Sequence, residues 1–245
     1  MFQQQMSLPM HLATVIPNPD DLLALAPEQL AGPLLVHLNS LGQARMLSHT
    51  ELFHDTRFAD VWREKAELCH HALMEAWTVL ERESLIAPHP SRERIYFVTR
   101  RGCELRSTAD YNSFRHALLF PKGSIHPLLE QTTYPLFLLG DYETAILKAF
   151  KEIEVAVRTA APELDPKLYG VDLMRKAFSP TGGPLADSNE PAAEAEALSA
   201  LFAGAIGRFK NPASHRHVPV TSPQETIEVL QFASHLLRVI EDRTT

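Results

Sequence analysis

The chain has few of the features that stabilise a protein covalently or hold it in a membrane. It contains only two cysteines, Cys69 and Cys103, which form neither a disulfide framework nor the paired spacing of a zinc site. It has no apolar run of about 18 residues, the length that spans a membrane, and no basic segment followed by an apolar run at its start. We therefore expect a reduced cytoplasmic protein that makes no membrane contact.

Phosphate-loop glycines and excess positive charge are also missing. The pair Gly182-Gly183 lacks the Lys-Ser/Thr ending of a nucleotide-binding loop. The 23 basic residues are outnumbered by 30 acidic ones, which gives a formal net charge of −7 at pH 7. Because this net charge repels polyanions, general affinity for nucleic acid is excluded, and any such contact must be local.

The chain does contain ample apolar material with helical spacing. Its 245 residues, 45% of them hydrophobic, favour two domains. Most apolar stripes recur at intervals of three and four, so the fold class is predicted to be mainly α. We predict an extended leader over residues 1–19, a first domain over 20–107, a linker over 108–121 and a helical bundle over 122–245.

The first domain is predicted to combine helices with a short hairpin. Pro27 and the pair Gly32-Pro33 interrupt residues 22–41, which suggests two short helices, the first capped by Asp20. A helix over residues 61–84 follows, with a predicted apolar face of Leu68, Ala72, Ala76, Val79 and Leu80. A strand, a polar turn, a second strand and a short helix come next. This order resembles an α+β winged helix, with residues 67–84 as recognition helix and 87–94 as wing.

Arginines gather around this predicted wing. Five occur within fifteen residues, and such side chains suit phosphate contacts. Two alternatives stay open, since a charged hairpin can simply be solvated and winged helices also bind proteins. We predict nucleic-acid contacts for Arg92, Arg94, Arg100 and Arg101, and a DNA or protein partner for the domain.

The bundle has clear helix signals. Asp141 is predicted to cap a helix over 142–161 with the stripe Ile146, Phe150, Ile153 and Val157. Helices are also expected over 125–138 and 168–178. The last helix has a capping box of Ser222, Pro223 and Glu225, and its predicted buried side is Ile227, Leu230, Ala233, Leu237 and Ile240.

A further helix, starting after Pro191, leads into the segment whose residue types are best suited to catalysis. Its predicted apolar face is Leu198, Leu201, Phe202, Ala205 and Ile206, and it should end near Lys210 because the next residue precedes a proline. The segment from Gly204 to His217 (GAIGRFKNPASHRH) combines imidazoles with cations. Histidine can take and give a proton near neutrality, and a cation can neutralise a phosphate. The sequence therefore indicates a phosphoryl-transfer site.

Three segments resemble the HEPN superfamily of helical domains, and more closely its Ymh-like branch. They are FKEIEVAVR (150–158), GVDLMRKAFSP (170–180) and LFAGAIGRFKNPASH (201–215). The resemblance implies a bundle of HEPN type whose members include metal-independent ribonucleases that act as dimers. It assigns the site to an arginine and a histidine that are separated by four to six intervening residues. Here either Arg208 or Lys210 can take the arginine's place before His215, and lysine lacks the bidentate guanidinium fork.

The implied reaction is attack of an RNA 2′-hydroxyl on the adjacent phosphorus. His215 would act as general base or acid, Arg208 or Lys210 would stabilise the phosphorane charge, and Asn211 would orient the phosphate or the imidazole. Arg216 is a further candidate for nucleic-acid contact. No cofactor or metal is required, and His215 with His217 lacks a third ligand. Because one imidazole cannot fill both proton roles at once, we predict a homodimer.

Two supporting residues are expected on the helix over 142–161. Glu154 is expected to hold His215 or Arg208, with Arg158 on the same face. The alternative is that Glu154 and Arg158 form a surface i, i+4 ion pair.

The leading functional hypothesis is thus a metal-independent endoribonuclease, by analogy with the superfamily a toxin or antiviral defence effector. The alternatives are a noncatalytic dimeric regulator that binds nucleic acid and an assembly subunit of a defence complex. In both alternatives His215 has a structural role only.

Overall fold

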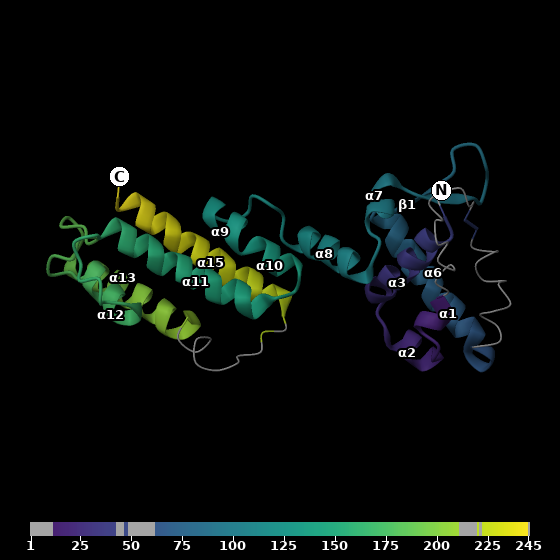
Figure 1. The fold of residues 1–245 in the computed structure, drawn as a ribbon, viewed down its shortest axis with the longest axis horizontal. Coiled ribbons are helices and arrows are strands. Elements are labelled where there is room, and N and C mark those ends of the chain that lie inside the picture. Colours follow the sequence, from purple (N-terminus) through teal and green to yellow (C-terminus); the bar gives the residue numbers. More distant parts are fainter. Residues whose placement is uncertain (1–11, 43–46, 49–61, 211–219, 221, 245) are drawn as a thin grey trace, which may run out of the picture. The chain divides into compact units, whose positions relative to one another are not determined.

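The computed structural model describes residues 12–42, 47, 48, 62–210, 220 and 222–244. The chain divides into two compact units, Met1–Asn112 and Ser113–Thr245 (Figure 1). The predicted linker over 108–121 contains a helix, α8 (Thr108–Leu119). A local signal for it exists, because Ser107 and Asp110 cap its start reciprocally: the Ser107 amide donates to Asp110 Oδ2 (2.9 Å) and the Asp110 amide to Ser107 Oγ (3.1 Å).

Helices α2 (Pro19–Ala24), α3 (Pro27–Ser40) and α6 (Ala66–Arg82) form the body of the N-terminal unit. Smaller elements are α1 (Leu12–Val15), the 3-10 turn η1 (Arg63–Lys65) and α7 (Arg100–Glu104). The extended leader over 1–19 is wrong in its last part, since α1 and the start of α2 lie there. Asn18 caps α2 instead of Asp20, its Oδ1 accepting from the Asp20 amide at 3.0 Å.

Two predictions about the helices of this unit are wrong in part. The two helices expected here correspond to α2 and α3, and Pro27 begins α3 as expected, but the predicted break at Gly32-Pro33 is absent because Pro33 lies inside α3. The burial of Leu30, Leu34, Leu35 and Leu38 offsets the one hydrogen bond that Pro33 removes. In α6 the predicted face is right at Ala76, Val79 and Leu80, which are buried, and wrong at Leu68, which is 56% exposed. The buried side also contains Cys69, Leu73 and Trp77.

A two-stranded antiparallel hairpin follows α6. Strand β1 (Ile86–Pro88) pairs with β2 (Tyr96–Val98) in the register Ile86 to Val98. Leu47 adds an isolated antiparallel bridge to Tyr96. Gly102 lets α7 approach the hairpin, because a Cβ there would lie 2.2 Å from the Leu85 carbonyl oxygen.

The C-terminal unit consists of helices around one core. They are α9 (Pro127–Thr132), α10 (Tyr134–Leu138), α11 (Tyr142–Ala160), α12 (Gly170–Ala177), α13 (Ala192–Ala205), the π-helical segment η2 (Ile206–Lys210) and α15 (Pro223–Asp242). The long helices α11 and α15 lie side by side (Figure 1). Helix α12 packs on α13, and η2 contacts both α11 and α12.

Most predictions for this unit are confirmed. The stripe on α11 and all five predicted residues on α15 are buried. Asp141 caps α11 through the Thr144 amide at 3.3 Å, and Ser222 caps α15 through the Glu225 amide at 3.2 Å. Two details differ: residues 125–138 form two short helices, the second with Pro135 in its first turn, and Leu201 is 43% exposed.

Candidate functional site

The candidate site is built on the π-helical segment η2 that continues α13. π-helical turns are rare and occur often at functional sites. Ile206 is buried, and the Phe209 ring stacks on Phe150 of α11 with centroids 4.8 Å apart. This stacking fixes η2 against α11. In sequence, Arg208 and Lys210 therefore stand directly before and after an aromatic residue that is anchored on α11.

Lys210 is bound by Glu154 of α11. Its Nζ lies 2.6 Å from Glu154 Oε2, and the side chains are only 20% and 15% exposed. The same oxygen accepts the Gly170 amide at 3.2 Å. That amide belongs to the first turn of α12, for which Tyr169 gives no side-chain cap. Glu154 thus supplies from another helix the negative charge that the N-terminus of α12 favours.

Arg158 lies one turn further along α11 and binds the backbone that leads into α12. Its Nη2 donates to the Leu168 carbonyl oxygen. Among the described residues Glu154 and Arg158 form no ion pair with each other, so the surface-pair alternative is wrong. Glu154 holds Lys210 and not Arg208, which corrects that part of the prediction. The predicted contact of Glu154 with His215 lies outside the described residues.

The surroundings of the Arg208 side chain differ from those of Lys210. Its side chain is exposed, and its Cζ lies 5.8 Å from the centroid of the neighbouring Phe209 ring. Within the described part of the chain, no carboxylate neutralises its guanidinium. The two cations that the sequence left as alternatives are therefore unequal, because only Lys210 carries a carboxylate partner here.

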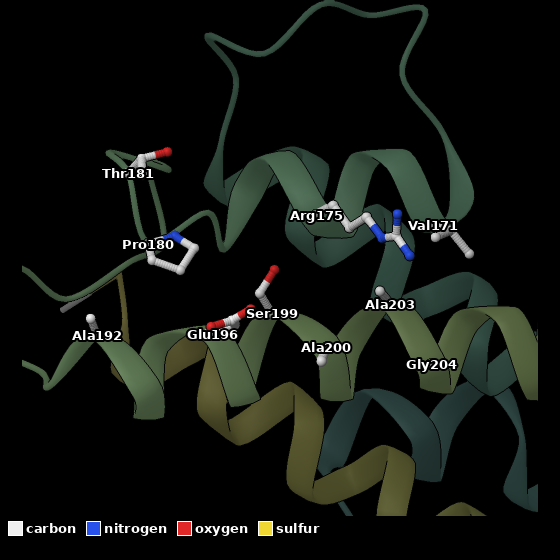
Figure 2. Close-up of a pocket in the computed structure, with 10 residues that line it drawn as sticks. All are labelled: Val171, Arg175, Pro180, Thr181, Ala192, Glu196, Ser199, Ala200, Ala203 and Gly204. Carbon is white, nitrogen blue, oxygen red and sulfur yellow. The ribbon is translucent and has the colours of Figure 1, made fainter.

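A pocket of about 860 Å³ lies between α12 and α13 (Figure 2). The Arg175 side chain extends along it from α12, and the Ser199 hydroxyl points into it from α13. The pocket reaches Val171 and Gly204, and a Cβ on Gly207 would lie 3.4 Å from Val171 Cγ2. The lining residues are Val171, Arg175, Pro180, Thr181, Ala192, Glu196, Ser199, Ala200, Ala203 and Gly204.

The remaining predicted site residues fall into two groups. Asn211, His215, Arg216 and His217 lie outside the described residues. The wing arginines Arg92, Arg94, Arg100 and Arg101 are exposed, but they belong to the N-terminal unit.

Sequence reasoning missed several residues of the C-terminal unit. The pocket residue Arg175 was not singled out although it lies in the second of the three segments that carry the resemblance, and Ser199 carries no local signal. Tyr169 and Gly170 were also missed, although Gly170 begins the second of the three matched segments. Its positive φ of 59° identifies it as a position that favours glycine.

Two kinds of feature are absent from the described ranges. No helix there is long and apolar enough to span a membrane. No three His, Cys, Asp or Glu side chains in those ranges are placed to hold a metal ion together.

Together, these features define the C-terminal unit as a helical bundle with a charged site at a π-helical turn. Residues 123–240 match the Hypoth_Ymh family, whose description is "Protein of unknown function (Hypoth_ymh)". The prediction of a Ymh-like C-terminal region is confirmed. No significant match was found among curated proteins or among solved structures.

Proposed function

We propose that the C-terminal unit is a metal-independent endoribonuclease of HEPN type that cleaves RNA and serves as a toxin or antiviral defence effector. The observation that carries this proposal is the exposed guanidinium of Arg208, which has no carboxylate partner among the described residues. It lies on a π-helical turn seven positions before His215 in sequence. A phosphodiester substrate would supply the missing negative charge.

The different environments of the two cations suggest different roles. Arg208 binds the scissile phosphate and stabilises the charge that develops on the phosphorane. Lys210 is already neutralised by Glu154 at 2.6 Å, so it contributes less to phosphate binding. Its role is to fix the chain directly before Asn211, and Asn211 orients the phosphate or the imidazole.

The reaction is a transesterification within the RNA strand. The 2′-oxygen attacks the adjacent phosphorus while His215 takes its proton, and the bond from phosphorus to the 5′-oxygen breaks. A second imidazole, His215 of a second copy of the chain, gives a proton to the departing 5′-oxygen. The products are a 2′,3′-cyclic phosphate and a 5′-hydroxyl end.

The test is cleavage of labelled RNA and labelled DNA in EDTA. We expect RNA alone to be cleaved, since DNA lacks the 2′-hydroxyl. His215→Ala should slow cleavage by about 10²- to 10⁴-fold, the usual contribution of general acid–base catalysis. His217→Ala is the matched control and should retain most activity. Cleavage of DNA, or equal activity in His215→Ala, would contradict the proposal.

Substitution of each cation then separates their roles. We expect Arg208→Ala to lose about 10²- to 10³-fold in rate, as for removal of one charge-stabilising donor. Lys210→Ala should lose less in rate and more in folding stability. Full activity in both variants would show that neither Arg208 nor Lys210 takes part in catalysis.

For the N-terminal unit we propose a winged helix that binds nucleic acid or a protein partner. The order α6, β1, β2 and the bridge from Leu47 to Tyr96 support the fold. The exposed side of α6 carries Glu67, Glu75 and Glu81, which disfavours insertion of this helix into DNA. The exposed wing arginines favour nucleic-acid contact through the hairpin instead.

These arginines also keep the noncatalytic regulator as a second candidate. A protein of this kind would not cleave RNA but would bind duplex nucleic acid with sequence selectivity. Arg92→Ala and Arg94→Ala should weaken that binding. Sedimentation over a range of concentrations tests the homodimer that the two-histidine scheme needs. A strictly monomeric protein that still cleaves RNA would rule that scheme out.

A further inference from the structure

One aromatic side chain of the C-terminal unit is exposed beside the candidate site. Tyr169 is 73% exposed, whereas Tyr134 and Tyr142 of the same unit are 6% and 8% exposed. No hydrogen bond of its hydroxyl to another described residue is found. Isolated exposed apolar residues are ordinary on protein surfaces. Exposure alone therefore does not assign a role to Tyr169. What distinguishes it is that the backbone on both sides of it is held in place.

Charged residues of α11 hold the backbone on both sides of Tyr169. Arg158 donates to the carbonyl oxygen of Leu168, and Glu154 accepts the amide of Gly170 at 3.2 Å. Tyr169 itself is extended, with φ −151° and ψ 164°. Because the backbone of such a residue is already fixed, only its two side-chain torsions are free. A ligand that packs on the ring therefore pays a small cost in conformational entropy.

The same contacts connect Tyr169 to the proposed phosphate site. Glu154 Oε2 binds both the Gly170 amide and Lys210 Nζ, at 3.2 and 2.6 Å. The peptide that follows Tyr169 is thus two polar contacts away from Lys210. Helix α12, which begins at Gly170, also contacts η2, the segment that contains Arg208. The exposed ring of Tyr169 and the exposed guanidinium of Arg208 therefore belong to the two segments that Glu154 joins.

We propose that Tyr169 is a stacking site for an unpaired nucleobase of the RNA strand next to the scissile phosphate. This inference rests on the proposed function. Proteins bind single strands through aromatic rings that stack on bases and cations that pair with the backbone. In an A-form duplex the base faces are covered by their neighbours, so Tyr169 selects single-stranded RNA.

The test measures binding of the full-length protein to a short fluorescein-labelled RNA in EDTA. Every ribose of this probe carries a 2′-O-methyl group, so it lacks the nucleophile and is not cleaved. We expect Tyr169→Ala to weaken binding about 5- to 150-fold, the range for loss of one stacked base. Tyr169→Phe and Tyr169→Trp keep a ring and should bind within about threefold of the wild type.

Two controls make the result specific. Leu139→Ala removes another apolar side chain of the same unit, 74% exposed, and should leave binding unchanged. A duplex form of the probe should bind wild type and Tyr169→Ala alike. With cleavable RNA, Tyr169→Ala should raise KM and leave kcat within about twofold, since the ring does not touch the reacting atoms.

The ways in which the two proposals can fail are distinguishable. If the wild type cleaves and binds RNA and Tyr169→Ala does the same, stacking is refuted and the proposed function stands. If the wild type neither binds nor cleaves RNA, both proposals fail. If Tyr169→Ala keeps RNA affinity but loses self-association, the ring contacts protein, which also overturns the stacking site.

Discussion

At the scale of single residues, Glu154 connects more parts of the candidate site than any other residue that the structure describes. One of its carboxylate oxygens binds the amide that opens α12 and the ammonium group of Lys210. Both partners lie in a region from which water is partly excluded, because the Glu154 and Lys210 side chains are 15% and 20% exposed. In such surroundings a charged acceptor stabilises its donors more strongly than it would on the surface.

We predict that Glu154→Gln lowers the free energy of unfolding by about 1.5–3 kcal/mol, the range for hydrogen bonds to charged groups. Urea denaturation measures this value. Glu152→Gln is the matched control on the same helix, since among the described residues Glu152 forms only an i, i+4 pair with Lys148 at 3.6 Å. It should cost about 0.5 kcal/mol or less. Equal losses in the two variants would show that Glu154 has no special connecting role.

The two cysteines lead to a prediction about chemical reactivity. Cys69 is fully buried in α6, and burial raises the pKa of its thiol, with Lys65 opposing this effect more weakly. The thiolate is the reacting species, so a raised pKa and burial both slow its reaction. We expect an aromatic disulfide reagent at pH 8 to modify the partly exposed Cys103 first. Cys103→Ser should remove the fast phase, and a fast phase that survives it would contradict the assignment.

At the scale of secondary-structure elements, the sequence predicted features set by near neighbours better than features set by contacts between distant residues. The Ser222 cap and the stripe on α11 depend on neighbours three or four positions apart, so the sequence contains them in full. Leu68 was misplaced because α6 has two overlapping apolar stripes, and packing against α3 and α2 selects the one with Cys69. The pair of Glu154 with Lys210 spans 56 positions and follows from the packing of η2 on α11. No sequence pattern marks the π-helical turn that sets this geometry.

Two glycines of this unit have opposite predicted effects. Gly170 has a φ of 59°, and alanine in this left-handed region costs about 1–2 kcal/mol. Gly204 is an exposed helical residue, and a Cβ added there would meet nothing within 4 Å, so alanine should stabilise α13 by about 0.8–1 kcal/mol. Thermal unfolding should therefore give a lower Tm for Gly170→Ala and a higher Tm for Gly204→Ala. Shifts of the same sign would contradict this account.

The pocket between α12 and α13 gives a further prediction. Arg175 lines it and has no ion pair among the described residues. If the RNA strand continues from Arg208 past Val171 into this pocket, Arg175 contacts a flanking phosphate. Arg175→Ala should then raise KM for RNA several-fold and lower the salt dependence of binding by about one phosphate contact. Lys176→Ala, on the next residue of α12, is the control and should leave both quantities unchanged.

At the scale of the whole molecule, the division into two units separates the proposed chemistry from the proposed partner recognition. The contacts of Glu154, Arg158 and Lys210, and the hydrophobic core from Phe120 to Ile240, all belong to the C-terminal unit. We predict that a fragment of residues 106–245, which keeps α8 with its Ser107 cap, folds cooperatively by circular dichroism. It should cleave short single-stranded RNA within about threefold of the full-length rate in EDTA, since nothing in the chemistry requires the first unit. The same fragment with His215→Ala is the control. A fragment that folds but is inactive, beside an active full-length protein, would mean that the N-terminal unit contributes directly to the site.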